Sequence, residues 1–189
     1  MLRGVEADAL AALSSAAGPA GANPSVDRLT ARKIIAVGPG PAIAPISAPA
    51  PAASALELAG RAEPASALEI ARYRAEASIR LRLQGLGPTI AHWRNLRSRY
   101  RLQTADGLPE PGAFARGYAA ARVHLPWRRL CVPDSLALAR FLWARGIAGD
   151  LLFGVRLDPF AAHAWVQFGE LVLSDNVNVV ADYTPVFRL

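Results

Sequence analysis

The single cysteine of this sequence, Cys131, lies where a thiol becomes a nucleophile. It directly precedes residues 133–145 (PDSLALARFLWAR), whose apolar side chains recur at helical spacing. The helix dipole and the free backbone N–H groups at a helix start lower a thiol pKa and can hold an oxyanion. Arg128 and Arg129 add positive potential nearby. These features predict a reactive thiolate, against the alternative of a small buried apolar side chain.

A base and an acid follow the cysteine at positions that a hairpin would bring together. His163 begins the alternating segment 162–168, which is typical of a strand, and imidazole is the usual base for a thiol. A turn at residues 169–170 predicts that 171–174 forms the return strand, with Asp175 at its end. Asp175 could then fix the imidazole tautomer. A structural histidine and a turn-forming aspartate remain the alternatives.

Other residues compete for these roles. Asp182 is the main competing acid, and Asp134 and Asp158 are weaker candidates. His92 falls inside a predicted helix, and His124 lies seven residues before the cysteine, where it could line a cleft. One cysteine and three scattered histidines do not give the spacing of a structural zinc site, so we expect no metal.

The surrounding sequence predicts an α+β domain in which helices pack on an antiparallel sheet. Helices are expected at 65–84, 88–100, 111–122 and 133–145, strands at 150–156, 162–168 and 171–174, and extended chain at 177–180. Ser66 and Glu69 form a capping-box pattern at the first helix. Its apolar face is expected to consist of Leu68, Ala71, Ala75, Ile79 and Leu83.

Composition divides the chain into three parts. Residues 1–37 are expected to form a small helical module, residues 38–63 a Pro/Ala-rich linker without a packed interior, and residues 64–189 the main domain. The longest uncharged stretch, 34–56, is interrupted by prolines and cannot be a membrane-spanning helix. A lone thiol fits a reducing compartment, so we expect a soluble cytoplasmic protein.

Basic charge concentrates in the middle of the chain. Residues 61–130 carry 13 arginines against 5 acidic residues, within an overall net charge of +6. Such a segment could attract an acidic peptide or a nucleic acid, or it could be a solvated arginine face on helices. We favour the solvated face and expect neither a nucleic-acid nor a membrane partner.

Two segments, LCVPDSLALARFLWARGI and LLFGVRLDPFAAHAWVQFGELVLSD, resemble the C-terminal domain of the lasso peptide leader peptidases, the B proteins of lasso peptide biosynthesis. The resemblance implies a transglutaminase-like fold, with Cys131 as nucleophile, His163 as base and then acid, and Asp175 as orienter. It also implies a precursor peptide as substrate. The chain would have no cofactor of its own. A partner cyclase similar to asparagine synthetase would use ATP to close the macrolactam.

The N-terminal part departs from this family pattern. Residues 2–37 resemble only the last part of a PqqD-like leader-binding domain, without the opening strands that would pair with a leader. We therefore expect a truncated or reduced leader-recognition region. The alternatives to a peptidase are a transglutaminase-like acyltransferase with the same three residues and a non-catalytic peptide-binding scaffold.

Overall fold

The computed structural model describes residues 27, 31, 46–102 and 110–189. Two compact units are distinguished, and the larger comprises residues 46–154 and 162–189. The other contains residues 155–161, which form the end of a hairpin. The expected helical module at 1–37 and its boundary with the linker lie outside the described residues, apart from two isolated positions.

The main unit is α+β, as expected. Its helices are α3 (Ala67–Gln84), α4 (Leu86–Arg97), α5 (Pro111–Arg122), α6 (Cys131–Trp143) and the short α7 (Val177–Ala181). Its strands are β1 (Ala53–Ser54), β2 (Asp150–Leu157), β3 (Phe160–Phe168), β4 (Leu171–Val172) and β5 (Thr184–Arg188). None of the helices in the described part of the chain is long and apolar enough to cross a membrane.

The five strands form one sheet in the order β1-β4-β3-β2-β5. The turn at Gly169, with φ +57°, joins β3 to the antiparallel β4, as the hairpin pattern predicted. β1 pairs with β4 in parallel, so the sheet is mixed at this edge, where the sequence had predicted an antiparallel sheet.

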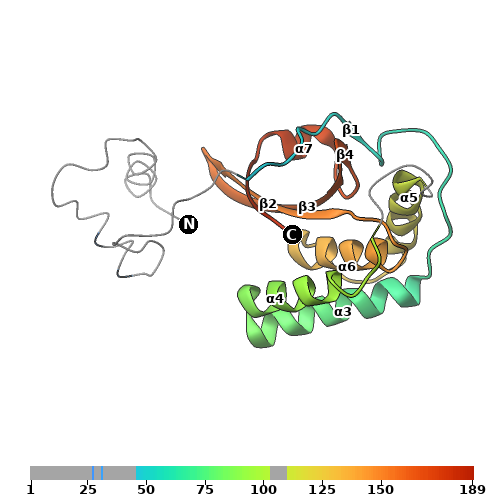
Figure 1. Cartoon of the computed structure of the whole chain (residues 1–189), viewed down its shortest axis with the longest axis horizontal. Helices are drawn as coiled ribbons and strands as arrows, with labels where there is room; N and C mark the ends of the chain where they lie inside the picture. Colours follow the sequence, from blue (N-terminus) through green and yellow to red (C-terminus); the bar gives the residue numbers. More distant parts are fainter. Residues whose placement is uncertain (1–26, 28–30, 32–45, 103–109) are drawn as a thin grey trace. The chain divides into compact units, whose positions relative to one another are not determined.

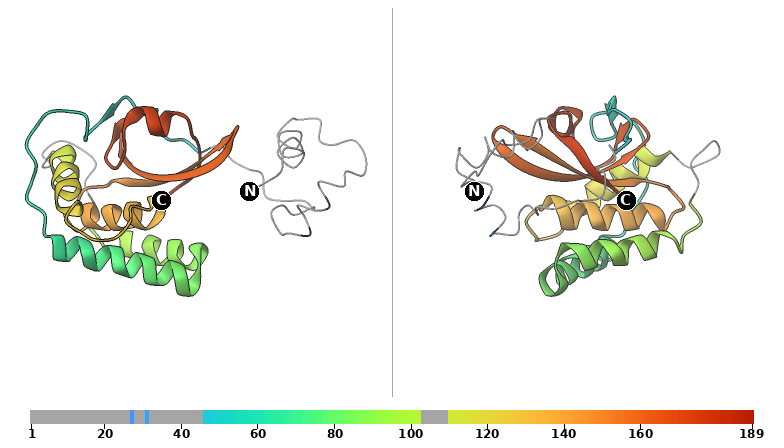
Figure 2. Two further views of the ribbon diagram at one scale, coloured as in Figure 1. Left: turned by 180° about the vertical axis from the view of Figure 1, so that it is seen from behind. Right: turned by 60° about the vertical axis from the view of Figure 1, so that its left-hand side comes forward.

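Layers of apolar side chains cover both faces of the sheet. α6 lies between the sheet and α3 and α4, while α7 lies on the opposite side (Figures 1 and 2). The larger core cluster joins α6 to the helices around it and to Leu151, Val166 and Leu173 of the sheet side. A smaller cluster on the other face includes Trp165 and Val180.

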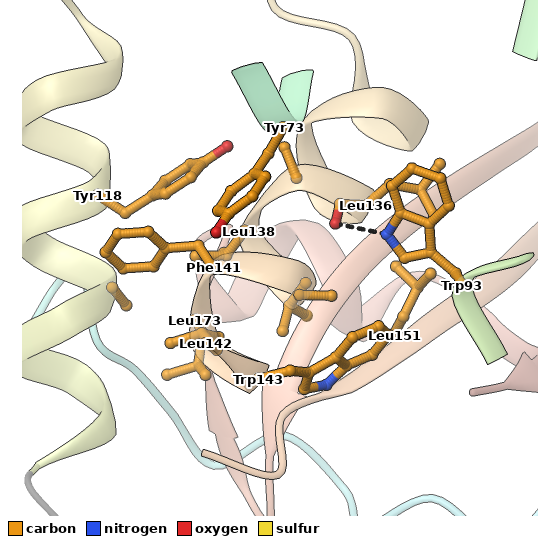
Figure 3. Packing of buried hydrophobic residues seen from close by; sticks show 14 of the residues in the cluster. Tyr73, Trp93, Tyr118, Leu136, Leu138, Phe141, Leu142, Trp143, Leu151 and Leu173 are labelled. Atoms are coloured by element: carbon orange, nitrogen blue, oxygen red, sulfur yellow. Dashed lines mark hydrogen bonds between the residues drawn. The ribbon is translucent and has the colours of Figure 1, made fainter. Parts of the chain in front are cut away.

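The central position of α6 follows from its sequence, because almost all of its side chains are apolar. Figure 3 shows Phe141, Leu142 and Trp143 packed among side chains from neighbouring elements. The indole N–H of Trp93, on α4, donates to the carbonyl of Leu136 at 2.9 Å, which satisfies a buried donor. The helix that begins at Cys131 is therefore packed between the sheet and the other helices.

The predicted apolar face of α3 was wrong. Leu68, Ile79 and Leu83 are 81%, 56% and 80% exposed, and the buried residues are Ile70, Tyr73, Arg74 and Ala77. Both sets have helical spacing, so periodicity alone did not separate them. The inward face packs Ile70, Tyr73 and Ala77 into the core, and its Arg74 pairs with a partly buried carboxylate on α6.

The C-terminal part also differs from expectation. Residues 177–180, expected to be extended, lie in α7, which begins after Asn176 in the extended conformation. β5, which the sequence pattern did not predict, pairs with β2 at the edge of the sheet. The exchange of two 2.9 Å backbone hydrogen bonds between Leu151 and Leu189 continues this pairing.

Residues 46–63 are not a linker. They include β1, and Ser54 and Ala55 are buried at 1% and 0% exposure. Proline and alanine favour extended chain, and here the extended chain supplies an edge strand. We refer to residues 46–63 as the strap.

Candidate active site

Cys131 is the first residue of α6, two positions earlier than the predicted helix start, because Pro133 fits within a first helical turn. Leu130, in the extended conformation, is the N-cap residue. Its N–H donates to Oδ2 of Asp134 at 2.7 Å, and the Asp134 N–H donates to its carbonyl at 3.1 Å. This reciprocal pair of bonds fixes the chain on either side of the cysteine.

A cluster of charged side chains anchors the same turn. Oδ1 of Asp134 accepts hydrogen bonds from Nε of Arg74 at 2.9 Å and Nε of Arg122 at 2.7 Å. Both arginine side chains are only 5% exposed. Arg122 also donates to the carbonyl of Trp127 at 3.0 Å, in the loop leading to the cysteine. We call these three charged residues the Asp134 cluster.

His163 lies on β3, which is tied to α6 because Ser135 Oγ donates to the carbonyl of Ala164 at 2.9 Å. Nε2 of the ring is 3.2 Å from Oδ1 of Asp175, an ion-pair contact whose geometry is not that of an aligned hydrogen bond. The ring stacks on Trp165, with centroids 6.2 Å apart, and contacts Tyr183 at 5.3 Å. The His163 side chain also forms a hydrogen bond with the Cys131 thiol.

Asp175 is held by two serines. Ser174 Oγ donates to Oδ2 of Asp175 at 2.6 Å and accepts the Val166 N–H at 2.9 Å, so the hydroxyl bridges the carboxylate and β3. Ser54 Oγ donates to the backbone carbonyl of Asp175 at 2.7 Å. These bonds leave Oδ1 of the carboxylate free to face the histidine.

The three groups shift one another's pKa values. Contact with His163 is the main cause that lowers the pKa of the Cys131 thiol, and the backbone N–H groups of Ala164 and Val132 act in the same direction. The Asp175 carboxylate is the main cause that raises the pKa of His163 to about 9, and the thiol adds to it. Both shifts favour a thiolate–imidazolium pair, the form of a cysteine nucleophile ready to react.

The candidate residues open onto one cavity of about 250 Å³. Cys131, His163 and Asp175 all line it, and Cys131 is exposed to solvent. Its walls are largely apolar and come from the strap, α5, α6 and the turn after β4: Leu56, Ala115, Tyr118, Ala119, Leu138 and Leu173. A substrate side chain of apolar character fits such a lining.

The competing residues lie elsewhere or are otherwise engaged. The Asp134 carboxylate lines the cavity but is paired with two arginines. Asp182 is the exposed C-cap of α7, and Asp158 lies in the turn after β2. Nε2 of His92 faces a glutamate at 3.3 Å, and His124 is exposed after α5.

Sequence reasoning missed the residues that hold the three. Ser174 fits the strand pattern like its neighbours, so only its position next to Asp175 could have indicated a role in the site. Arg74 and Arg122 lie 60 and 12 residues from Asp134, and no local pattern distinguishes them from the other arginines. Ser54 lay in the expected linker.

Comparison with known proteins adds a family to this geometry. The family model described as "Transglutaminase-like superfamily" matches residues 73–188, more than half of the chain. The microcin J25-processing protein McjB of Escherichia coli is 43% identical over 49 residues, which is 26% of this chain and 24% of that protein. The match therefore spans about a quarter of that relative's length. Both findings support the resemblance to the lasso peptide B proteins. No solved structure matches.

Proposed function

Because the chain belongs to the transglutaminase-like superfamily and brings a cysteine, a histidine and an aspartate to one cavity, we propose that it is a cysteine endopeptidase. Its substrate would be a ribosomally synthesised lasso peptide precursor, from which it removes the leader before macrolactam closure. The observation that carries the proposal is the position of His163 between the Asp175 carboxylate, which is the main cause that raises its pKa, and the Cys131 thiol, whose pKa it lowers.

The reaction begins with attack of the Cys131 thiolate on the carbonyl carbon of the last leader residue. The oxyanion that forms accepts hydrogen bonds from backbone N–H groups at the start of α6. The His163 imidazolium then protonates the leaving amine, which frees the N-terminus of the core peptide. Imidazole next takes a proton from water as it attacks the thioester, and the leader leaves as a free acid while the thiolate–imidazolium pair is restored.

Asp175 acts through the histidine in this scheme. Its carboxylate stabilises the imidazolium and directs Nε2 away from the thiol, so that the other ring nitrogen serves the sulfur. No cofactor of the chain's own enters any step. Any ATP requirement would belong to an asparagine-synthetase-like cyclase acting on the freed core.

The name of the matched relative supports the choice of substrate. McjB is a processing protein for microcin J25, and we extend processing of a ribosomal peptide to this chain. Leader recognition by residues 1–37 stays a prediction, because only residues 27 and 31 of this segment are described. We expect the precursor peptide and the cyclase to be its partners.

The direct test is incubation of a candidate precursor with the full chain, followed by mass spectrometry. We expect a free leader acid and a core peptide from the wild-type protein, and a loss of roughly 10⁵-fold or more in rate for Cys131→Ala. A leader joined to an added amine would indicate acyl transfer instead. Unchanged trimming by a folded Cys131→Ala protein would reject the peptidase mechanism.

A further inference from the structure

The strap lies N-terminal to the family match at 73–188, yet it reaches the catalytic acid. We propose that it is a working part of the active site. Ser54 is a positioning residue for Asp175, and Leu56 is a cavity wall that contacts the substrate. The role of Leu56 rests on the proposed peptidase function, whereas the role of Ser54 is testable without a peptide substrate.

The strap is fixed to the sheet just beside the catalytic acid. β1 pairs with β4 in the register that sets Ser54 against Val172. The Ala52 N–H donates to the carbonyl of Glu170 at 2.9 Å, and the Ala55 N–H donates to that of Val172 at 2.8 Å. These bonds add the strap to the sheet as an edge strand beside β4, the strand that leads to Asp175.

A second anchor joins the strap to α5. Arg116 donates from Nη1 to the carbonyl of Ala55 at 3.2 Å and from Nε to that of Arg61 at 2.9 Å. A Cβ built on Gly117 would lie 1.6 Å from the carbonyl oxygen of Glu63, so only glycine permits this approach. The strap is therefore held at both ends, and its middle has little freedom to leave the site.

The hydroxyl of Ser54 has a defined direction. Ser54 is 1% exposed, and its Oγ accepts the Leu56 N–H at 3.1 Å. The same Oγ donates its proton to the Asp175 carbonyl at 2.7 Å. A buried hydroxyl whose acceptor and donor roles are both used fixes the groups that it joins. Ser54 thus sets the backbone of Asp175, while Ser174 sets its carboxylate.

Leu56 is the strap residue that lines the cavity. It lines the cavity together with the apolar residues of α5 and lies two residues beyond the serine that holds the acid. An apolar side chain at this place contributes to substrate affinity, because it removes apolar surface of the peptide from water. The two strap residues should therefore affect different kinetic constants.

The first experiment follows the pH dependence of Cys131 alkylation by iodoacetamide in the full chain. Cys131 is the only cysteine, so a single thiol reports. We expect the wild-type profile to have two inflections: a lower one, where the Cys131 thiol ionises, and a second near pH 9, where the His163 imidazolium loses its proton. The second inflection is the one that reports His163. We expect Ser54→Ala to move this inflection to lower pH, because a displaced Asp175 stabilises the imidazolium less, and Ser54→Thr to restore it in part. Ser98→Ala, which removes an exposed hydroxyl bonded to the Asn95 carbonyl, is the matched control and should change nothing.

A double-mutant comparison separates positioning from general destabilisation. If Ser54 acts through Asp175, adding Ser54→Ala to Asp175→Asn should shift the inflection no further. Equal shifts in both backgrounds, or no shift in a Ser54→Ala protein that unfolds at the wild-type temperature, would overturn the positioning role. These outcomes do not depend on whether the chain cleaves any peptide.

Precursor cleavage then tests the two residues against each other. We expect Ser54→Ala to lower kcat by about 3- to 10-fold at similar KM, the loss of one hydrogen bond. Leu56→Ala should raise KM by a similar factor with kcat nearly unchanged. Because Leu56 is only partly buried, its variant tests the strap even if Ser54→Ala does not fold. If the wild-type protein cleaves the precursor and Leu56→Ala leaves KM unchanged, the strap does not contact the substrate.

Discussion

The two sides of the catalytic cavity are held by different kinds of interaction. On the nucleophile side, the Asp134 cluster fixes the start of α6 with paired charges that are largely shielded from solvent. On the acid side, the neutral hydroxyls of Ser174 and Ser54 hold Asp175. Breaking a buried charge pair leaves a desolvated ion, whereas losing a hydroxyl removes one hydrogen bond.

This difference teaches where the fold and the site are coupled. The nucleophile depends on charges that also join α3, α5 and α6, so the same residues support the domain and the cysteine. The acid depends on residues at the edge of the sheet, including a strap that the family match does not include. Substitutions on the nucleophile side should therefore affect stability and reactivity together, and those on the acid side mainly reactivity.

The largest expected effect is on the nucleophile side. Asp134→Asn should lower the free energy of unfolding by about 3–5 kcal/mol, because two buried arginines lose their counter-ion. It should also slow alkylation of Cys131 at neutral pH, since the turn before the cysteine loosens. Thermal unfolding and iodoacetamide labelling measure the two effects.

Asp150→Asn is the matched control for this substitution. Asp150 also bridges two arginines, Arg97 and Arg188, but does not line the cavity. Its partners are 27% and 40% exposed, so solvent screening reduces the cost to about 1–2 kcal/mol. Alkylation should stay at the wild-type rate. If both variants slowed labelling equally, the claim that the Asp134 cluster specifically supports the reactivity of Cys131 would be contradicted.

Next in size is removal of the acid's charge. Asp175→Asn should reduce precursor cleavage by about 10- to 100-fold, less than the loss of the nucleophile. The carboxylate raises the pKa of His163, so its removal lowers that pKa and moves the alkaline limb of the pH–rate profile from about 9 to lower pH. An alkaline limb that stays in place would show that Asp175 does not face the imidazolium in solution.

The smallest effect should follow loss of the hydroxyl beside the acid. Ser174→Ala removes the donor to Oδ2 of Asp175 and should cost about 10-fold in kcat, with unfolding temperature little changed. Steady-state kinetics and a thermal melt, with Ser98→Ala alongside, check both expectations. If Ser174→Ala lost as much stability as Asp134→Asn, the claim that substitutions on the acid side affect mainly reactivity would be wrong.

Local patterns predicted the elements that carry the site better than the contacts that hold them. The N-cap at Ser66, the span 111–122 and the turn at 169–170 each depend on residues close in sequence, and all three are confirmed. The order of Cys131, His163 and Asp175 predicted one shared cavity because a hairpin joins the last two.

The rest depended on partners far along the chain. The inward face of α3 packs Ile70, Tyr73 and Ala77 into the core and pairs Arg74 with Asp134, 60 residues further along the chain. The strap gains its structure from β4, more than a hundred residues later, so its Pro/Ala composition alone indicated a linker. Residues 177–180 are apolar enough for a strand, but packing of Val180 against the second face of the sheet favours α7.

The pH profile of Cys131 alkylation in the wild-type and His163→Ala proteins tests the central claim most directly, because this claim is that sulfur and imidazole share a charge pair. We predict that the lower of the two wild-type inflections, which reports the thiol, lies below the ordinary thiol value of about 8.5, and that it returns toward that value in His163→Ala. Coincident profiles with one inflection at or above about 8.5 would contradict the account.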